Sequence, residues 1–206
     1  MKAILKFNRN NLLFLFVFII CIIFSNNVSA ESYYAGTSKS GNNKGIAAKI
    51  KTPAQLPQLG YSGESCWVTN VYGSPMEWVQ TGLRYYNGYG KFKTYVESNI
   101  SGVYNLTEIG VHVLDFAGHY RVSYNSDGKW HAYIGYTDKG SFMMNSTAGV
   151  QAEGESHAID TQLGPFDFIQ VVYANSDGEW NWMDETPTAT YPFNVTIIDN
   201  ANYTVY

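Results

Sequence analysis

The chain has 206 residues, of which 45% are hydrophobic and 16% aromatic, and 13 basic residues stand against 17 acidic ones. This acidic balance argues against nucleic acid as a partner, because phosphate contacts need a basic surface. The four histidines are scattered and no cysteine cluster accompanies them. The sequence therefore gives almost no support for a metal site.

The first 30 residues have the layout of a secretory signal peptide. Three basic residues precede the unbroken apolar run Leu12–Phe24, and the small residues Val28–Ala30 supply a cleavage site. The apolar run is shorter than the roughly 20 residues that a membrane-spanning helix needs, although an uncleaved anchor is the alternative interpretation. We expect residues 1–30 to be removed and residues 31–206 to be secreted, with no membrane association after cleavage.

Residues 31–206 are expected to form a single domain. Loss of the leader leaves them with a formal charge of −7. Cys21 leaves with the leader, so Cys66 has no partner for an internal disulfide, and a buried structural thiol is its usual role. No linker divides the rest, and the length suffices for one hydrophobic core. We expect a monomer that is stabilised by packing.

The pattern along the chain predicts strands separated by short turns. Tyr, Trp, Val, Ile and Thr fill the segments, and Gly, Asn, Asp and Ser lie at the breaks. The predicted strands are Gly45–Thr52, Cys66–Val71, Met76–Tyr86, Lys91–Glu97, Gly110–Asp115, His119–Asn125, Lys129–Tyr136, Ala148–Glu155, Phe166–Tyr173, Glu179–Met183 and Phe193–Asp199. Residues 31–44 and 184–192 are predicted as loops, and two Asp-Gly sequences, at 127–128 and 177–178, as tight hairpins. No segment has a helical period, so we expect an all-β, antiparallel two-sheet sandwich.

The stretch Met76–Tyr86 places a glutamine among aromatic residues. In a strand, Gln80 shares one face with Trp78, Arg84 and Tyr86. One interpretation is a solvated sheet face. The other is a groove whose floor combines aromatic rings with one polar amide.

A second stretch, Gly149–His157, places Gln151, Glu153 and Glu155 on one face of a predicted strand. Neighbouring carboxylates repel each other, which raises the pKa of one of them and suits acid–base catalysis. The alternative is an edge strand with a solvated acidic face, because charges commonly protect sheet edges.

Short motifs along residues 31–206 occur in the order found in one family of peptidases. They are Tyr33–Gly36 (YYAG), Gly45–Pro53, Ser65–Val68 (SCWV), Val79–Gly82 (VQTG), Phe92–Glu97, Gln151–Glu153 (QAE), Pro165–Phe166 and Val195–Asp199. Together they resemble the glutamic peptidases of the eqolisin type and, more distantly, the neprosin-like proteins. These are exported acid proteases on a concanavalin A-like, jelly-roll-type sandwich.

The resemblance implies a catalytic pair of one glutamine and one glutamate. Gln80 matches the glutamine of the family's Gln-Thr-Gly motif. The preceding alanine favours Glu153 as the glutamate, whereas a neprosin-like Gly-Glu pair favours Glu155. The family's carboxylate activates water, and its amide stabilises the oxyanion. The implied function is a secreted acid endopeptidase without a cofactor, acting on polypeptides.

Trp67, Trp78 and Tyr95 are the candidate substrate-binding residues of the implied groove. The chain departs from the family at Gly154, where a tryptophan follows the glutamate, and at Tyr33-Tyr34, where Asn-Trp is usual. The alternative function is a non-catalytic module that binds a glycan or another surface polymer, since aromatic rings stack on sugars. A glycoside hydrolase would need two facing carboxylates, and the sequence shows no clear pair on separate strands.

Overall fold

The computed structural model describes residues 33–57, 64–73, 77–86, 88–144, 147, 149–156 and 163–206, and for residues 64–68 the backbone alone. The predicted leader, with its cleavage site, and His157 lie outside these ranges. The described residues contain no helix that is long and apolar enough to cross a membrane.

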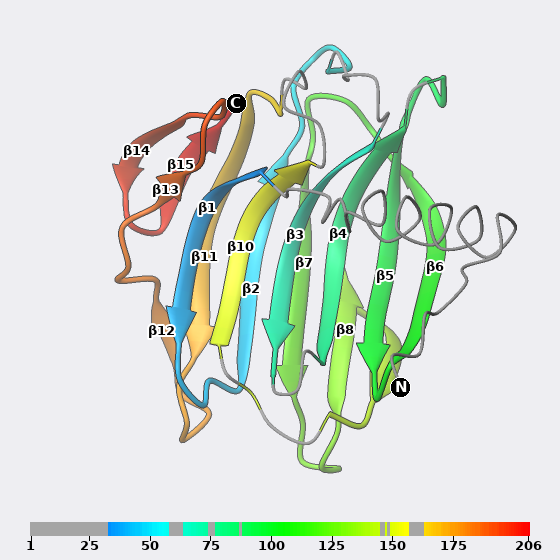
Figure 1. The fold of residues 1–206 in the computed structure, drawn as a ribbon, viewed down its shortest axis with the longest axis vertical. Helices are drawn as coiled ribbons and strands as arrows, with labels where there is room; N and C mark the ends of the chain where they lie inside the picture. The colour runs from blue at the N-terminus through cyan, green and yellow to red at the C-terminus, as the bar shows by residue number, and fades with distance from the viewer. Residues whose placement is uncertain are drawn as a thin grey trace, which may run out of the picture. The chain divides into compact units, whose positions relative to one another are not determined.

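Two antiparallel sheets make up the fold (Figure 1). The strands of the first sheet are β1 (Tyr33–Ser40), β3 (Glu64–Tyr72), β4 (Trp78–Tyr86), β5 (Phe92–Ile100), β6 (Val103–His112), β10 (Gly149–Ser156) and β13 (Thr188–Ala189). The strands of the second are β2 (Gly45–Lys51), β7 (Ala117–Tyr124), β8 (Trp130–Ile134), β9 (Thr137–Phe142), β11 (Phe166–Ala174), β12 (Trp180–Trp182), β14 (Val195–Asp199) and β15 (Asn202–Val205). The first sheet runs in the order β13-β1-β10-β3-β4-β5-β6, and the second in the order β14-β15-β11-β2-β7-β8-β9, with β12 also paired to β11. The predicted all-β sandwich is confirmed.

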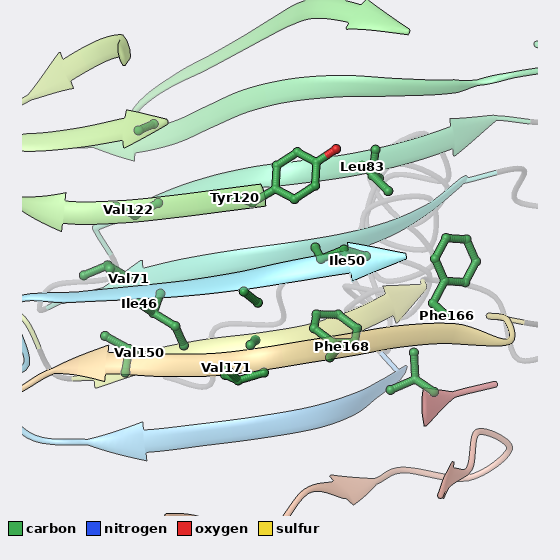
Figure 2. Packing of buried hydrophobic residues seen from close by; sticks show 14 of the residues in the cluster. Ile46, Ile50, Val71, Leu83, Tyr120, Val122, Val150, Phe166, Phe168 and Val171 are labelled. Carbon is green, nitrogen blue, oxygen red and sulfur yellow. The ribbon is translucent and has the colours of Figure 1, made fainter. Parts of the chain in front are cut away.

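The core lies between the two sheets because each inner strand buries every second side chain there. Ile46 and Ile50 of β2 and Leu83 of β4 are fully buried. Figure 2 shows these side chains gathered with Phe166 and Phe168 of β11 between strands of both sheets. The alternation that buries these residues turns the intervening side chains of the first sheet away from the core.

Both Asp-Gly turns form hairpins as predicted. Gly128 has a φ of 78° and Gly178 a φ of 89°, which glycine adopts without steric cost. The amide of Gly128 donates to the carbonyl of Asn125 at 3.0 Å, and that of Gly178 to the carbonyl of Asn175 at 2.9 Å. The first turn joins β7 to β8 and the second joins β11 to β12.

Several strands of the structure were not predicted from the sequence, or were predicted with the wrong bounds. Residues 33–40, predicted as loop, form β1, and the segments of β9, β13 and β15 are also strands that were not predicted. β1 is rich in Gly, Ser and Thr, so it shows no apolar alternation; its pairing with β10 over eight residues makes it a strand. The predicted strand Gly110–Asp115 is wrong in its bounds, because β6 ends at His112 and Asp115 has a φ of 52° in a turn. β6 is a sheet edge and mostly exposed, so alternation gives little signal.

Candidate active site

The candidate residues gather on the outer face, by which we mean the face of the first sheet that turns away from the core. On β4, Val79 and Leu83 are buried in the core, so Gln80 points to the outer face. On β10, Val150 and Ala152 are in the core, so Glu153 points to the outer face as well. The two predicted stretches therefore contribute to one surface.

Gln80 is held by groups on the neighbouring strand β5. Its Nε2 donates to Oε2 of Glu97 at 2.6 Å and to the hydroxyl oxygen of Tyr95 at 3.1 Å. The hydroxyl of Tyr104, on β6, donates to the other carboxylate oxygen of Glu97. Gln80 is only 6% exposed. A bond from a neutral amide to a charged acceptor is stronger than one between neutral groups, so Glu97 fixes the orientation of the amide.

Asn70 lies beside Gln80 in the row of residues that crosses the sheet. The register sets Gln151, Asn70, Gln80 and Glu97 directly opposite one another on β10, β3, β4 and β5. Nδ2 of Asn70 donates to Oε1 of Gln151 at 2.8 Å, whereas the buried Oδ1 of Asn70 has no hydrogen-bond partner among the described residues. An unmet buried acceptor is unfavourable, so Oδ1 of Asn70 is a polar atom in this row whose burial is not compensated by a hydrogen bond within the described part of the chain.

Glu153 is a buried carboxyl group. It is 6% exposed, and burial raises its pKa to about 8, with the charge of Glu155 acting in the same direction. Gly36 lies opposite it on β1. A Cβ at position 36 would stand 2.6 Å from the Cβ of Glu153, so glycine is required for this close approach.

The register favours Glu153 over Glu155 as the partner of Gln80. One strand, β3, separates β10 from β4. Gln151 is level with Gln80, and the two glutamates are two and four residues further along β10. With strands about 4.8 Å apart and a rise of about 3.4 Å per residue, the Cα of Gln80 is about 12 Å from that of Glu153 and about 17 Å from that of Glu155. By this measure Glu153 is the nearer of the two glutamates to Gln80.

The predicted groove residues differ in where they lie. Trp78 is half-buried on the outer face, and its ring meets that of Tyr104 edge-on at 6.2 Å between centroids. Tyr95 of β5 is fully buried, and its hydroxyl oxygen accepts from the Gln80 amide. The backbone of Trp67 pairs with Leu83 and Gly154, but its side chain is outside the described part of the chain.

Arg84 lies on the outer face two residues beyond Gly82, and it is 3% exposed. Its guanidinium stacks over the ring of Tyr86 at 4.3 Å from the centroid. The row of Arg84 contains Cys66 and Glu155. Glu155 therefore belongs to the end of the face that carries this cation.

Sequence reasoning missed the role of Glu97 and the contribution of Tyr104 and Asn70. The signal for Glu97 was present in the hairpin between β4 and β5. A turn centred near Gly88 places Gln80 and Glu97 opposite each other. A carboxylate opposite a candidate catalytic amide is a reason to examine the pair. The contact of Tyr104 depends on the unpredicted part of β6.

The described histidines have structural or surface surroundings. His112 is buried, accepts from or donates to the Tyr120 hydroxyl at 2.9 Å, and has its pKa lowered by burial. His131 contacts Asp127 and Asp138 at the surface. Within the described ranges no three His, Cys, Asp or Glu side chains are grouped so that they could hold a metal ion.

Comparison with solved structures relates this arrangement to known proteins. A scan of family models and a search of curated proteins find no match. Two crystal structures of Scytalido-glutamic peptidase, each with a transition-state analogue, are similar at TM-scores of 0.61 and 0.62 and identities of 17% and 16%. SCP-B, a member of the eqolisin family in complex with the tripeptide Ala-Ile-His, is similar at a TM-score of 0.57 and 15% identity. Each comparison covers 85% of this chain and 98% of the other. The chain has the β-sandwich fold of the eqolisin-type glutamic peptidases.

Proposed function

We propose that the protein is a secreted glutamic-type endopeptidase whose catalytic pair is Gln80 and Glu153. One observation carries the proposal: a buried amide and a buried carboxyl share the outer face, one strand apart, in a fold whose solved relatives are peptidases. The substrate class follows from those relatives, which were solved with peptide-like ligands. Fold alone does not fix function, so the chemistry of the pair must support the assignment.

In the proposed reaction, the carboxylate of Glu153 takes a proton from a water molecule, and the resulting hydroxide attacks the carbonyl carbon of the scissile peptide. The C–N bond then breaks, and Glu153 returns its proton to the leaving amine. The carboxylate is regenerated, so one water is consumed for each bond cleaved. A single carboxyl group thus serves as base and then as acid.

Gln80 would stabilise the negative charge that develops on the carbonyl oxygen. In the substrate-free chain, both protons of its amide are in use, one on Glu97 at 2.6 Å and one on Tyr95 at 3.1 Å. The bond to the neutral phenol is the longer one, so an oxyanion can replace it at the lower cost. The bond to Glu97 would persist and hold the amide in place. Removal of one such donor typically lowers kcat by about 100- to 1,000-fold.

The raised pKa of Glu153 changes the expected pH range. A general base must be ionised, and a carboxyl group with a pKa of about 8 is mostly protonated in acid. Activity that depends on the Glu153 carboxylate should therefore increase toward pH 8. This differs from the acid optimum that the family resemblance predicts.

The direct test is cleavage of a denatured protein by wild type and by Gln80→Ala, Glu153→Gln and Glu155→Gln, across acid to mildly alkaline pH. Pepstatin and a chelator exclude contaminating peptidases of other types. We expect loss of cleavage in the first two variants and retention in the third. A folded wild type that cleaves nothing would refute the proposal.

The glycoside hydrolase alternative receives less support. Its two carboxyl groups should lie about 5–10 Å apart across the scissile bond. Glu97 and Glu153 are on β5 and β10, with two strands between them, and Glu97 is engaged by Gln80 and Tyr104. If the outer face were instead a non-catalytic glycan-binding surface, Gln80 and Glu153 would have no chemical role.

A further inference from the structure

A cavity of about 660 Å³ lies on the second sheet, away from Gln80 and Glu153. It is lined by Trp182, Met183, Asp199, Asn200, Ala201 and Asn202. Its origin is a change of partner along β11, which pairs with β15 at Phe166–Phe168 and with β12 at Val172–Ala174. Figure 1 shows β12 and the β14–β15 hairpin on the same side of the domain, at different heights.

The polar wall of this cavity is fixed by hydrogen bonds. Oδ1 of Asp199 accepts from the Ala201 amide and from Nδ2 of Asn202, both at 2.9 Å. Oδ1 of Asn202 accepts from the backbone amide of Gln170, whose φ of 55° marks the bulge in β11. Nδ2 of Asn200 donates to the carbonyl of Asp184 at 2.8 Å. A wall that is already ordered loses little conformational entropy when it binds a ligand.

The lining of the cavity also includes an indole that is largely open to solvent. Trp182 is 61% exposed, while Met183 next to it is buried. An exposed tryptophan beside a concave polar surface is unusual for a residue whose ring is normally buried. Its ring offers a flat apolar face with a polar edge.

The hydrogen-bonding groups that remain on Asp199 and Asn200 include both acceptors and a donor. Asn200 uses one amide proton on Asp184, which leaves its second N–H and its carbonyl oxygen. Asp199 retains acceptor positions on Oδ2, which accepts one bond from Asn202 at 3.1 Å. A pair of neighbouring hydroxyl groups, each able to donate and accept, matches such a set.

We infer that this cavity is a glycan-binding site in which a neutral sugar ring stacks on Trp182 and its hydroxyl groups bond to Asp199 and Asn200. The Asp199 carboxylate and the charge of −7 on residues 31–206 disfavour an anionic polysaccharide. Lys39 already pairs with the nearby acidic residues Asp184 and Glu185 at 2.7 and 3.1 Å, which reduces the attraction for a cationic ligand. The inference does not depend on peptidase activity, because the cavity and the pair belong to different sheets.

The test is isothermal titration of the full protein with hexasaccharides of β-1,4-linked glucose, N-acetylglucosamine and xylose and of α-1,4-linked glucose. We expect at least one to bind, Trp182→Ala to weaken that binding by tenfold or more, and Asn200→Ala to weaken it severalfold. Trp180→Ala is the matched control, because Trp180 is exposed on the same strand but does not line the cavity. It should bind within twofold of wild type.

Three results would overturn the inference. They are no binding to any of the four oligosaccharides, equal losses in the Trp182 and Trp180 variants, and tighter binding of a lysine-rich peptide than of any sugar. Circular dichroism of each variant checks that it is folded. Peptide cleavage should be unchanged in Trp182→Ala, so failure of the glycan site and failure of the proposed peptidase function are separate outcomes.

Discussion

At the scale of single residues, the orientation of Gln80 depends on Glu97. An amide that must donate to an oxyanion has to present its NH₂ end, and the amide of a glutamine can rotate by half a turn at little cost. The carboxylate of Glu97 accepts only, so it selects the NH₂ end. The Tyr104 hydroxyl, which donates to the same carboxylate, holds the acceptor in place.

Glu97→Gln should therefore reduce kcat by about tenfold with little change in KM, because a charge-assisted bond worth about 1.5–3 kcal/mol becomes a neutral one worth about 1 kcal/mol. Steady-state kinetics on a peptide substrate measure this. Glu108→Gln is the control, since Glu108 faces Lys93 at 3.5 Å on the neighbouring strand and does not touch Gln80. Equal activities of the Glu97 and Glu108 variants would show that Glu97 does not position the amide.

At the scale of strands, β1 and β10 approach each other closely beside Glu153. Gly36 faces Glu153 with no room for a side chain. Its backbone φ is 155°, and an added Cβ would also lie 2.3 Å from the Ala152 carbonyl oxygen. The separation of the two strands at this point thus depends on glycine.

We expect Gly36→Ala to destabilise the fold by about 1–3 kcal/mol through overpacking and to reduce activity by displacing Glu153. Gly41→Ala is a suitable control. Gly41 also has a positive φ, of 108°, but an added Cβ would meet nothing within 4 Å. Urea denaturation measures the loss of stability in both variants, and peptide cleavage reports whether Glu153 is displaced. If Gly36→Ala is destabilised but cleaves at the wild-type rate, the added methyl group does not displace Glu153, and the prediction is wrong.

The strands that the sequence predicts well are those that bury one face. β2, β4 and β11 follow the alternation or apolar run of core strands, and their predicted bounds are within a few residues of the observed ones. β1 was not predicted, because its small residues next to a buried glutamate show no apolar pattern. Most of β6 was not predicted, because an exposed edge strand has no buried face and so shows no alternation of apolar residues. β1 and β6 are strands because they pair with other segments of the chain, and local propensity does not predict such pairing.

The site was predictable to a similar degree. Gln80 and Glu153 were predicted from motifs, each on one face of its own strand, and their catalytic roles stay predictions; the register supplies the distance argument that spacing alone could not. Glu97, Tyr104 and Asn70 depend on side-chain geometry across three strands. The sequence of one strand does not determine which strands lie beside it in the sheet, so these contacts could be identified only from the structure.

At the scale of the whole molecule, the burial of Glu153 couples folding to pH. Its pKa is about 8 in the folded chain against 4.5 for an ordinary glutamate. Between these values the unfolded chain has lost the proton that the folded chain keeps. Stability is therefore fully retained below about pH 4.5 and decreases as pH rises toward 8, by up to about 1.4 kcal/mol per pH unit.

Glu153→Gln removes this titration, so the variant should gain stability over wild type as pH rises from 4.5 to 8 and show a much smaller difference at pH 4. Chemical denaturation at several pH values measures the free energy of unfolding of both proteins. Glu155→Gln provides the comparison on the same strand. A difference between Glu153→Gln and wild type that does not change with pH would contradict the buried, protonated state.

The sandwich also separates the two proposed activities. The proposed catalytic pair lies on the outer face of the first sheet, whereas the cavity at Trp182 belongs to the second. The buried core lies between them and joins both faces into one cooperative structure. Substitutions on one face should therefore leave the other face unaffected when they preserve the fold.

The pH dependence of kcat/KM for peptide cleavage, compared between wild type and Glu153→Gln, tests the central claim most directly. If Glu153 is the base, the wild-type value should increase with pH along a limb whose apparent pKa is close to 8, and the variant should lack both the limb and most of the activity. A variant that cleaves as fast as wild type, or a wild type whose activity decreases steadily from acid toward pH 8, would contradict the assignment of Glu153 as the catalytic base.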